Sequence, residues 1–408
     1  MVQYASGMIP KAATTIQKAD IDALIENARI EDRTIEYKRD LPGPADEDRR
    51  EFLRDVSAFV NGLGGDIVYG IEEKAGIPTS APGVAIVNFD DLRLRLQNIL
   101  QSSLAPPLPL IEIEQIEGFP NGSVLLLRAH QSWRGPHMVT FKGLRQFFVR
   151  GNGEKHAMDV VELRAAFVGS EALNDRIRSF RDGRIARILA GESPIKSLIA
   201  PTLVLHLIPV DTSFNRVDFD IRSIERALSK LNEPGQHPAL VYASFARPNL
   251  DGVAIVSSAY EQRFGLSKSY TQVFRNGGIE FAEAQCEPGE SGLEPRYLDG
   301  NDAEIQMLDL VRNAFRFRKQ IELSGPVLLS LSLLHVDGSS IMPAGRRPDL
   351  YPKLFDRDIV VLPEVITYED PIDYAKTLRP LFDSMWQAAG HRGSYSYDAD
   401  GSYNARRG

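Results

Sequence analysis

The stretch that decides the fold of this chain reads EDRTIEYK at residues 31–38, AFVN at residues 58–61 and GGDIVYGIEE at residues 64–73. Residues 34–38 alternate as in a short strand, where side chains two positions apart point to the same face. Residues 45–61 place apolar side chains on one stripe, which predicts a helix. Glycines end that helix, and the β-branched run after them predicts a second strand.

Carboxylates lie on both of these predicted strands. Glu36 and Lys38 share one face of the first strand, and the second strand ends at Glu72 and Glu73. Hard cations such as Mg²⁺ or Mn²⁺ take oxygen ligands, and a bound ion can activate water and stabilise charge on a scissile phosphate. If the strands are neighbours, the pattern predicts a divalent-metal site beside a lysine. The alternative is a set of surface carboxylates, with Glu36 paired to Lys38 or to an arginine.

The same residues resemble the Schlafen-type, AlbA-like (AlbA_2) domain of many bacterial proteins. Its pattern is Glu-x-x-x-x-Glu-aromatic-Lys, a helix ending in Ala-Phe-Ala-Asn, and a Gly-Gly strand that ends in two acids. This chain matches at Glu31, Glu36, Tyr37, Lys38, Ala58, Phe59, Asn61, Gly64, Gly65, Gly70, Ile71, Glu72 and Glu73. It departs at Val60 and Gly62 and has glutamate where aspartate is common. The resemblance extends over about residues 17–190.

The resemblance implies nucleic-acid binding and, in the nuclease members of the family, cleavage of tRNA or rRNA by three acids with a divalent ion. These roles fall on Glu31, Glu36 and Glu73 as catalytic residues and metal ligands, with Glu72 as the alternative third acid and Lys38 holding the phosphate. The implied cofactor is Mg²⁺ or Mn²⁺, the implied substrate is RNA or single-stranded nucleic acid, and a role in bacterial defence would suit such an enzyme. Many members are described only as DNA-binding regulators. A non-catalytic transcriptional regulator is therefore the alternative function.

Charge is distributed unevenly along the chain. The formal net charge is -8, yet residues 124–190 carry 12 Lys+Arg against 6 Asp+Glu. A basic surface within an acidic protein is expected where the protein meets phosphates. In this segment we expect nucleic-acid contacts from Arg145, Arg150, Lys155, Arg181 and Arg184, with His156 in the same loop as Lys155. Ion pairs within the domain are the alternative for these side chains.

Two further features of this half have a structural and a functional interpretation. Trp133 would stack on a base or serve as a partly buried anchor. The pair Gly64-Gly65 is interpreted as a helix cap and tight turn, because no Gly-Lys-Ser/Thr ending follows it as in a nucleotide-binding P-loop.

The expected fold class is α+β, with an N-terminal Schlafen/AlbA-like α/β domain followed by a second α+β domain with a mixed sheet. The expected boundaries are an N-terminal arm at 1–16, the AlbA-like domain at 17–190, a linker at 191–201, the second domain at 202–390 and a disordered tail at 391–408. The second domain is expected to sense a ligand, a partner or the oligomeric state. A structural or assembly protein built on this domain is a third class of function.

Composition excludes several other classes. The single cysteine, Cys286, excludes an internal disulfide and any cysteine-based zinc cluster, so the chain needs no oxidising compartment. Residues 1–10 lack the basic start and apolar run of a signal peptide, and no apolar stretch approaches the roughly 20 residues that span a bilayer. We therefore expect a cytoplasmic protein without a membrane partner. The sequence leaves open whether the chain is a homo-oligomer.

Overall fold

A computed structural model describes most of the chain. The described residues are 8–9, 11, 13–108, 111–132, 134–151, 154–194, 200–210, 218–231, 246–256, 269–285, 296–323, 325–343, 351–367 and 370–404. Two compact units result, Met1–Arg176 and Ile177–Gly408. We call them unit 1 and unit 2. Their division lies inside a helix, before the linker expected at 191–201.

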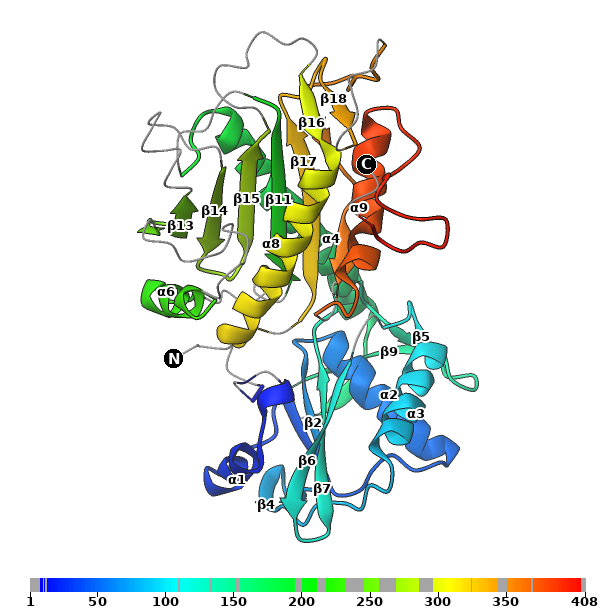
Figure 1. Ribbon diagram of the computed structural model, residues 1–408. Coiled ribbons are helices and arrows are strands. Elements are labelled where there is room, and N and C mark those ends of the chain that lie inside the picture. Colours follow the sequence, from blue (N-terminus) through cyan, green and yellow to red (C-terminus); the bar gives the residue numbers. More distant parts are fainter. Residues whose placement is uncertain are drawn as a thin grey trace. The chain divides into compact units, whose positions relative to one another are not determined.

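Unit 1 contains a four-stranded sheet in the order β1-β2-β7-β6 (Figure 1). These strands are β1 (Ile35–Lys38), β2 (Gly65–Tyr69), β7 (Gly122–Ala129) and β6 (Glu112–Phe119). β1 runs parallel to β2, whereas the other two pairings are antiparallel. The sheet is therefore mixed, and the strands of the two motifs are neighbours, which is the condition on which the predicted metal site depends.

A second sheet of unit 1 has the order β10-β9-β8-β5. Its strands are β10 (Lys155–Ala157), β9 (Gln146–Arg150), β8 (Met138–Val139) and β5 (Leu104–Ala105). A separate hairpin joins β3 (Glu72–Lys74) to β4 (Ile77–Ser80). Its turn needs positive φ at both central residues, which are Ala75 at 54° and Gly76 at 74°. This turn follows the two acids at the end of the glycine motif.

Helices cover both faces of the four-stranded sheet. On one face, α2 (Asp46–Val60) and α3 (Phe89–Ser103) pack on a buried cluster that includes Ile67 and Leu127. The other face is covered by the 3-10 helix η1 (Ala13–Thr15) and by α1 (Lys18–Glu26), which contact a cluster that includes Val68. Successive residues of β2 thus face opposite layers, because side chains alternate along a strand.

The N-terminal segment differs from the loose arm expected at residues 1–16. Ile9, Ala13 and Ile16 are buried in the core. The buried Arg128 pairs with Asp66 through Nε–Oδ1 at 2.7 Å and Nη2–Oδ2 at 2.8 Å, and it also donates to the main-chain oxygens of Ile9 and Lys11. These contacts fix the segment to the sheet. Its apolar residues have no helical period, so the sequence pattern did not reveal it.

Packing explains why the motif has glycine at position 65 and asparagine at position 61. A Cβ on Gly65 would lie 2.3 Å from ring atoms of Phe59 and 2.7 Å from the main-chain oxygen of Thr34, so only glycine fits where α2 turns into β2. The Asn61 amide nitrogen donates to the main-chain oxygens of His137 and Phe148 at 2.9 and 3.0 Å. Asn61 therefore ties the end of α2 to β8 and β9. These contacts fix α2 against both sheets.

Unit 2 contains a larger sheet in the order β12-β13-β14-β15-β11-β17-β19, with β20 also paired to β17. Its strands are β12 (Arg247–Pro248), β13 (Gly252–Val256), β14 (Ser269–Phe274), β15 (Ile279–Ala284), β11 (Thr202–Pro209), β17 (Val327–Leu334), β19 (Ile359–Val361) and β20 (Val365–Thr367). A parallel pair, β16 (Tyr297–Asp299) and β18 (Ser340–Met342), lies apart from it. The described pairings of the larger sheet are antiparallel.

The helices of unit 2 lie on both faces of this sheet. α8 (Gly300–Gln320) and α9 (Tyr374–Ala388) lie in front of it in Figure 1, and α4 (Val160–Leu189) lies behind. Ile185 of α4 packs with Val204 and Tyr270 of the sheet. The short helix α6 (Ile221–Ser229) also belongs to this unit. Both units combine helices with sheets, which confirms the α+β class.

The C-terminal segment differs from the disordered tail expected at residues 391–408. Residues 391–404 are packed, and the Tyr395 ring centroid lies 5.0 Å from that of Trp386. Elsewhere, α4 continues through Gly169, because a glycine inside a helix costs only about 1 kcal/mol. β14 and β15 form a hairpin that turns at residues 275–278.

Candidate nucleic-acid interface

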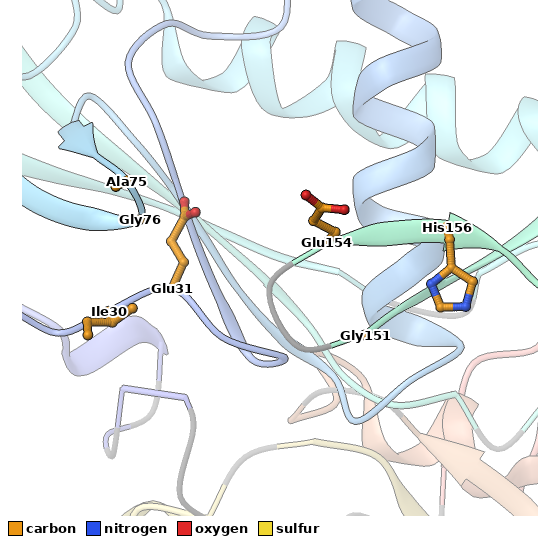
Figure 2. Close-up of a pocket in the computed structure, with 7 residues that line it drawn as sticks. All are labelled: Ile30, Glu31, Ala75, Gly76, Gly151, Glu154 and His156. Atoms are coloured by element: carbon orange, nitrogen blue, oxygen red, sulfur yellow. The ribbon is translucent and has the colours of Figure 1, made fainter.

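Glu31 lies just before β1, against the turn of the β3–β4 hairpin. Its main-chain N–H donates to the Gly76 oxygen at 2.8 Å, and its Oε1 accepts from the Tyr37 N–H at 2.7 Å. Glu31 also lines a pocket of about 540 Å³ (Figure 2). The other lining residues are Ile30, Ala75, Gly76, Gly151, Glu154 and His156. The first acid of the motif is thus held at a surface cavity by main-chain contacts.

Three motif acids interact electrostatically around this position. Burial raises the pKa of Glu31; the hydrogen bond from Tyr37 and the charge of Arg150 oppose this, whereas the charges of Glu36 and Glu73 raise the pKa further. The net direction is upward, because burial and the two like charges outweigh the opposing groups. The other two acids that the resemblance selects therefore act electrostatically on Glu31.

Glu36 is buried, with 7% of its surface exposed, and both of its oxygens are paired. Oε2 lies 2.5 Å from Nη1 of Arg150, and Oε1 lies 2.7 Å from Nζ of Lys38. Glu36 and Lys38 thus share one face of β1, as the strand alternation predicts. These contacts match the alternative interpretation of the sequence, in which Glu36 pairs with Lys38 or with an arginine.

Two acids of α2 extend these contacts and were not predicted. Nζ of Lys38 lies 3.6 Å from Glu51 Oε1 and 3.5 Å from Asp55 Oδ2, and Lys155 pairs with both acids. Together with Glu36 and Arg150, these side chains form an ion-pair network between β1, α2, β9 and β10. The only sequence signal was the four-residue spacing of Glu51 and Asp55, which also suits a solvated helix face.

The network shifts the pKa values of its members. Burial raises the pKa of Asp55 to about 6, helped by the charge of Glu36 and opposed by Lys155 and Lys38. Burial lowers the pKa of Lys38, but the charges of Asp55 and Glu36 outweigh it, so the net direction is upward. Lys38 is therefore a cation held by three carboxylates.

The acids that end the glycine motif have different partners. Glu73 is exposed, and its Oε2 accepts from the Gly76 N–H at 2.6 Å. Glu72 lies 3.0 Å from Nε of Arg39 and accepts from the Ser80 hydroxyl at 2.6 Å. Glu73 shares Gly76 with Glu31 and influences the Glu31 pKa, so it is the better placed of the two as a third acid.

The same side chains are engaged in contacts that bear on divalent-metal binding. Among the described residues, no group of three or more His, Cys, Asp or Glu side chains is arranged to hold a metal ion. Glu36 directs both oxygens at cations of its own chain. Glu31 and Glu73 each use one oxygen to accept from a main-chain amide. A three-carboxylate metal site would thus require Glu36 to change partners.

The basic side chains expected to contact nucleic acid in unit 1 have unequal surroundings. Arg145 is exposed at the start of β9, and no ion pair joins it to the described part of the chain. Arg150 is buried, where it pairs with Glu36 and donates to the Asp32 main-chain oxygen at 2.8 Å. Lys155 belongs to the ion-pair network. Only Arg145 of these three directs its charge to solvent.

The two arginines expected to contact nucleic acid in unit 2 also pair within the chain. Arg181 lies 2.7 Å from Glu364 and 2.8 Å from Asp182. Arg184 forms two hydrogen bonds of 2.8 Å to Glu280, which is fully buried. Arg181 and Arg184 lie three residues apart on one face of α4, and this face packs against other parts of unit 2. The sequence had left open whether these arginines contact nucleic acid or form ion pairs within the chain, and the structure shows the ion pairs.

Two residues with predicted roles, Trp133 and Cys286, lie outside the described residues. His156, noted only as a neighbour of Lys155, lies in β10 at the pocket, and its Nε2 is 2.9 Å from Oε1 of Glu162. Every helix in the described ranges is too short or too polar to cross a membrane.

Two solved structures align with part of this chain. A crystal structure of the DIP2311 protein from Corynebacterium diphtheriae has 12% identity and a TM-score of 0.25, covering 35% of this chain and 29% of that chain. An NMR structure of the N-terminal domain of a RecG-related protein from Nitrosomonas europaea has 22% identity and a TM-score of 0.25, covering 34% of this chain and 92% of that chain. No curated protein matches the chain.

The family match contains all three motifs and is shorter than the resemblance expected over about residues 17–190. The match begins at Glu31, the first acid of the motif, and ends at Asp159, at the start of α4. It includes the pocket residues Gly76, Glu154 and His156. Residues 31–159 match the family described as Schlafen, AlbA_2, and this segment of the chain is an AlbA_2 domain.

Proposed function

We propose that the AlbA_2 domain binds nucleic acid and cleaves RNA or single-stranded nucleic acid with a divalent metal ion. The observation that carries the cleavage proposal is the position of Glu31, which lines a pocket and whose pKa is raised by burial and by the charges of Glu36 and Glu73. Carboxylates that repel one another are stabilised by a cation between them. Bound metal would supply an activated water and charge stabilisation at the phosphate.

The residues of this chain have separate roles in the proposal. Glu31 is oriented by the Tyr37 amide of β1 and Glu73 by the Gly76 amide of the hairpin turn, so their positions need little reorganisation. Glu36 joins them when Arg150 or Lys38 releases one of its oxygens. Lys38 keeps positive charge beside the acids through Glu51 and Asp55. Cleavage of tRNA or rRNA by these residues would suit the defence role that the resemblance implies.

A specific observation favours the non-catalytic alternative. Glu36 is buried with both oxygens in ion pairs, and removing one partner of such a pair typically costs about 3–5 kcal/mol. If the pairs persist with ligand bound, the acids are structural and the domain is a DNA- or RNA-binding module, such as a transcriptional regulator.

The test is incubation of the purified full chain with tRNA, rRNA and single-stranded DNA, with Mn²⁺ or with EDTA. Cleavage that needs Mn²⁺ and is lost in Glu31→Gln and Glu73→Gln supports the proposal. The control is Glu117→Gln, an exposed acid of β6 away from the pocket. Binding without cleavage, with unchanged affinity in Glu31→Gln, would establish the non-catalytic alternative. If no nucleic acid binds at low salt, both functions are wrong.

A further inference from the structure

A helix cap orients the imidazole of His156. Nε2 of the ring lies 2.9 Å from Oε1 of Glu162. Glu162 is itself fixed at the start of α4, since its Oε2 accepts from the Asp159 N–H at 3.0 Å and its own N–H donates to Asp159 Oδ1 at 2.8 Å. This reciprocal pair is a capping box. The ring of His156 is therefore positioned by an element of the fold, although 47% of its side chain is exposed.

The charge of Glu162 decides which ring nitrogen carries the hydrogen. The hydrogen bond from Asp159 and then that from His156 lower the pKa of Glu162, so its side chain is a carboxylate that only accepts hydrogen bonds. Nε2 of His156 must then donate, which leaves Nδ1 of the neutral ring as an acceptor. Nδ1 lies on the side of Gly151, where an added Cβ would be 3.8 Å away, and Figure 2 shows the ring beside Gly151 at the pocket.

The pocket therefore presents mainly hydrogen-bond acceptors. The carboxylates of Glu31 and Glu154 line it together with the imidazole of His156 (Figure 2). Its remaining walls are the side chains of Ile30 and Ala75 and the main chain of the two glycines. Carboxylates repel a phosphate, whereas hydroxyl and amino groups can donate to each of these acceptors. The volume of about 540 Å³ lies within the range of small-ligand sites.

We propose that this pocket takes the ribose of an RNA ligand, with Nδ1 of His156 accepting a hydrogen bond from the 2′-hydroxyl group. The inference rests on the proposed nucleic-acid binding and names RNA as its ligand class. DNA lacks the 2′-hydroxyl and would leave the desolvated acceptor without a donor. His156 is then the residue that distinguishes the two sugars, and Glu162 is a positioning residue that holds Nε2 so that Nδ1 faces the pocket.

The decisive experiment compares sugars at constant base sequence. The full chain is titrated against one mixed-sequence single strand made as RNA, as DNA and as 2′-O-methyl RNA, in EDTA, with fluorescence anisotropy as the readout. RNA should bind more tightly than the other two. His156→Ala should lower RNA affinity about 3- to 10-fold, the range of one neutral hydrogen bond, and should leave DNA affinity unchanged.

A second variant separates orientation from folding. Glu162→Gln keeps the capping box, because glutamine serves at this position, but its amide also offers a donor to the imidazole. We expect the RNA preference to fall while the melting temperature stays the same. Nitrogen-15 NMR of the wild type should show the Nε2–H form of His156. Glu171→Gln, an exposed glutamate on the same helix, is the matched control and should change neither quantity.

The outcomes distinguish this inference from the function on which it rests. Equal binding of RNA and DNA by the wild type would overturn the ribose assignment alone. A proportional loss of both affinities in His156→Ala, or a preference that follows base sequence rather than sugar, would also overturn it. If no strand binds, the proposed function fails together with the inference.

Discussion

Two clusters of charged side chains, one in each unit, surround their carboxylates differently. In unit 1, Glu31 faces a pocket, and burial together with the charges of Glu36 and Glu73 raises its pKa. In unit 2, burial alone would raise the pKa of Glu280, but hydrogen bonds and charges from Arg184 and His206 lower it to about 2. Glu280 is fully buried and Glu31 is partly buried. The neighbours therefore decide the direction of the shift.

This difference indicates what each cluster does. Glu280 has its partners inside the chain: Arg184, His206 and the Tyr270 hydroxyl at 2.9 Å. Such an acid stabilises the fold as long as its partners stay in place. Its two oxygens already accept hydrogen bonds within the chain, so they are not available to a ligand. Glu31 lies beside other acids, so a proton, a cation or a hydrogen-bond donor lowers its energy. An acid that lines a pocket and has a raised pKa, as Glu31 does, is the better functional candidate.

The largest expected effect is in unit 2. Arg184→Ala leaves the charge of Glu280 buried with one cation fewer, which should lower the free energy of unfolding by about 3–5 kcal/mol. Denaturant unfolding measures it. Arg187→Ala, an exposed arginine on the same helix, should change stability by less than about 0.5 kcal/mol. Equal effects of the two variants would mean that the buried pair does not stabilise unit 2.

Acid should act next most strongly on the same cluster. Because the folded pKa of Glu280 lies below its ordinary 4.5, its contribution is present above pH 4.5 and is lost as the pH falls toward 2. A pKa lowered from 4.5 to about 2 corresponds to about 3 kcal/mol. Thermal melts between pH 5 and pH 2 should show this loss for the wild type. Glu280→Gln should weaken the dependence, and an unchanged profile would contradict it.

The contribution of Asp55 to stability should change with pH in the direction opposite to that of Glu280. Its folded pKa of about 6 lies above the ordinary 3.8, so protonation favours the folded form as the pH falls through this window. Carbon-13 NMR of the Asp55 carboxyl group should titrate near pH 6. Lys38→Met should move the midpoint higher, because a cation that favours the carboxylate is removed. A midpoint near 3.8 in the wild type would show that the ion-pair network compensates burial.

The smallest effect is expected at the surface of unit 1. Arg145→Ala should weaken nucleic-acid binding uniformly across sequences and reduce the slope of log affinity against log salt by about 1. Arg93→Ala, an exposed arginine paired with Asp90 at 3.0 Å, is the control and should leave the slope unchanged. If Arg93→Ala lowered the affinity for nucleic acid more than Arg145→Ala did, the phosphate-binding surface would lie along α3.

The sequence predicted those parts of unit 1 that depend on local rules. Alternation along residues 34–38 placed Glu36 and Lys38 on one face, and the glycine pair correctly ended the helix before β2. Each of these follows from periodicity or from backbone conformation within a few residues.

The missed contacts depend on distant residues. Arg150 reaches Glu36 across 114 positions, and Lys155 reaches Asp55 across 100. A basic segment looks the same whether its charges face phosphates or carboxylates of the same chain. For the same reason the sequence could not distinguish Arg145, which is exposed, from Arg184, which is buried.

The contacts of Arg128 have a consequence for how the domain can be excised. Similarity to the AlbA_2 family begins at residue 31, yet Arg128 donates to the carbonyl groups of Ile9 and Lys11. A fragment cut at residue 31 would expose the cluster around Val68 to water and leave the guanidinium short of acceptors. Such a fragment should bind hydrophobic dyes and be cleaved readily by proteases. The shortest autonomous fragment of this domain therefore begins upstream of Ile9, more than twenty residues before the family match.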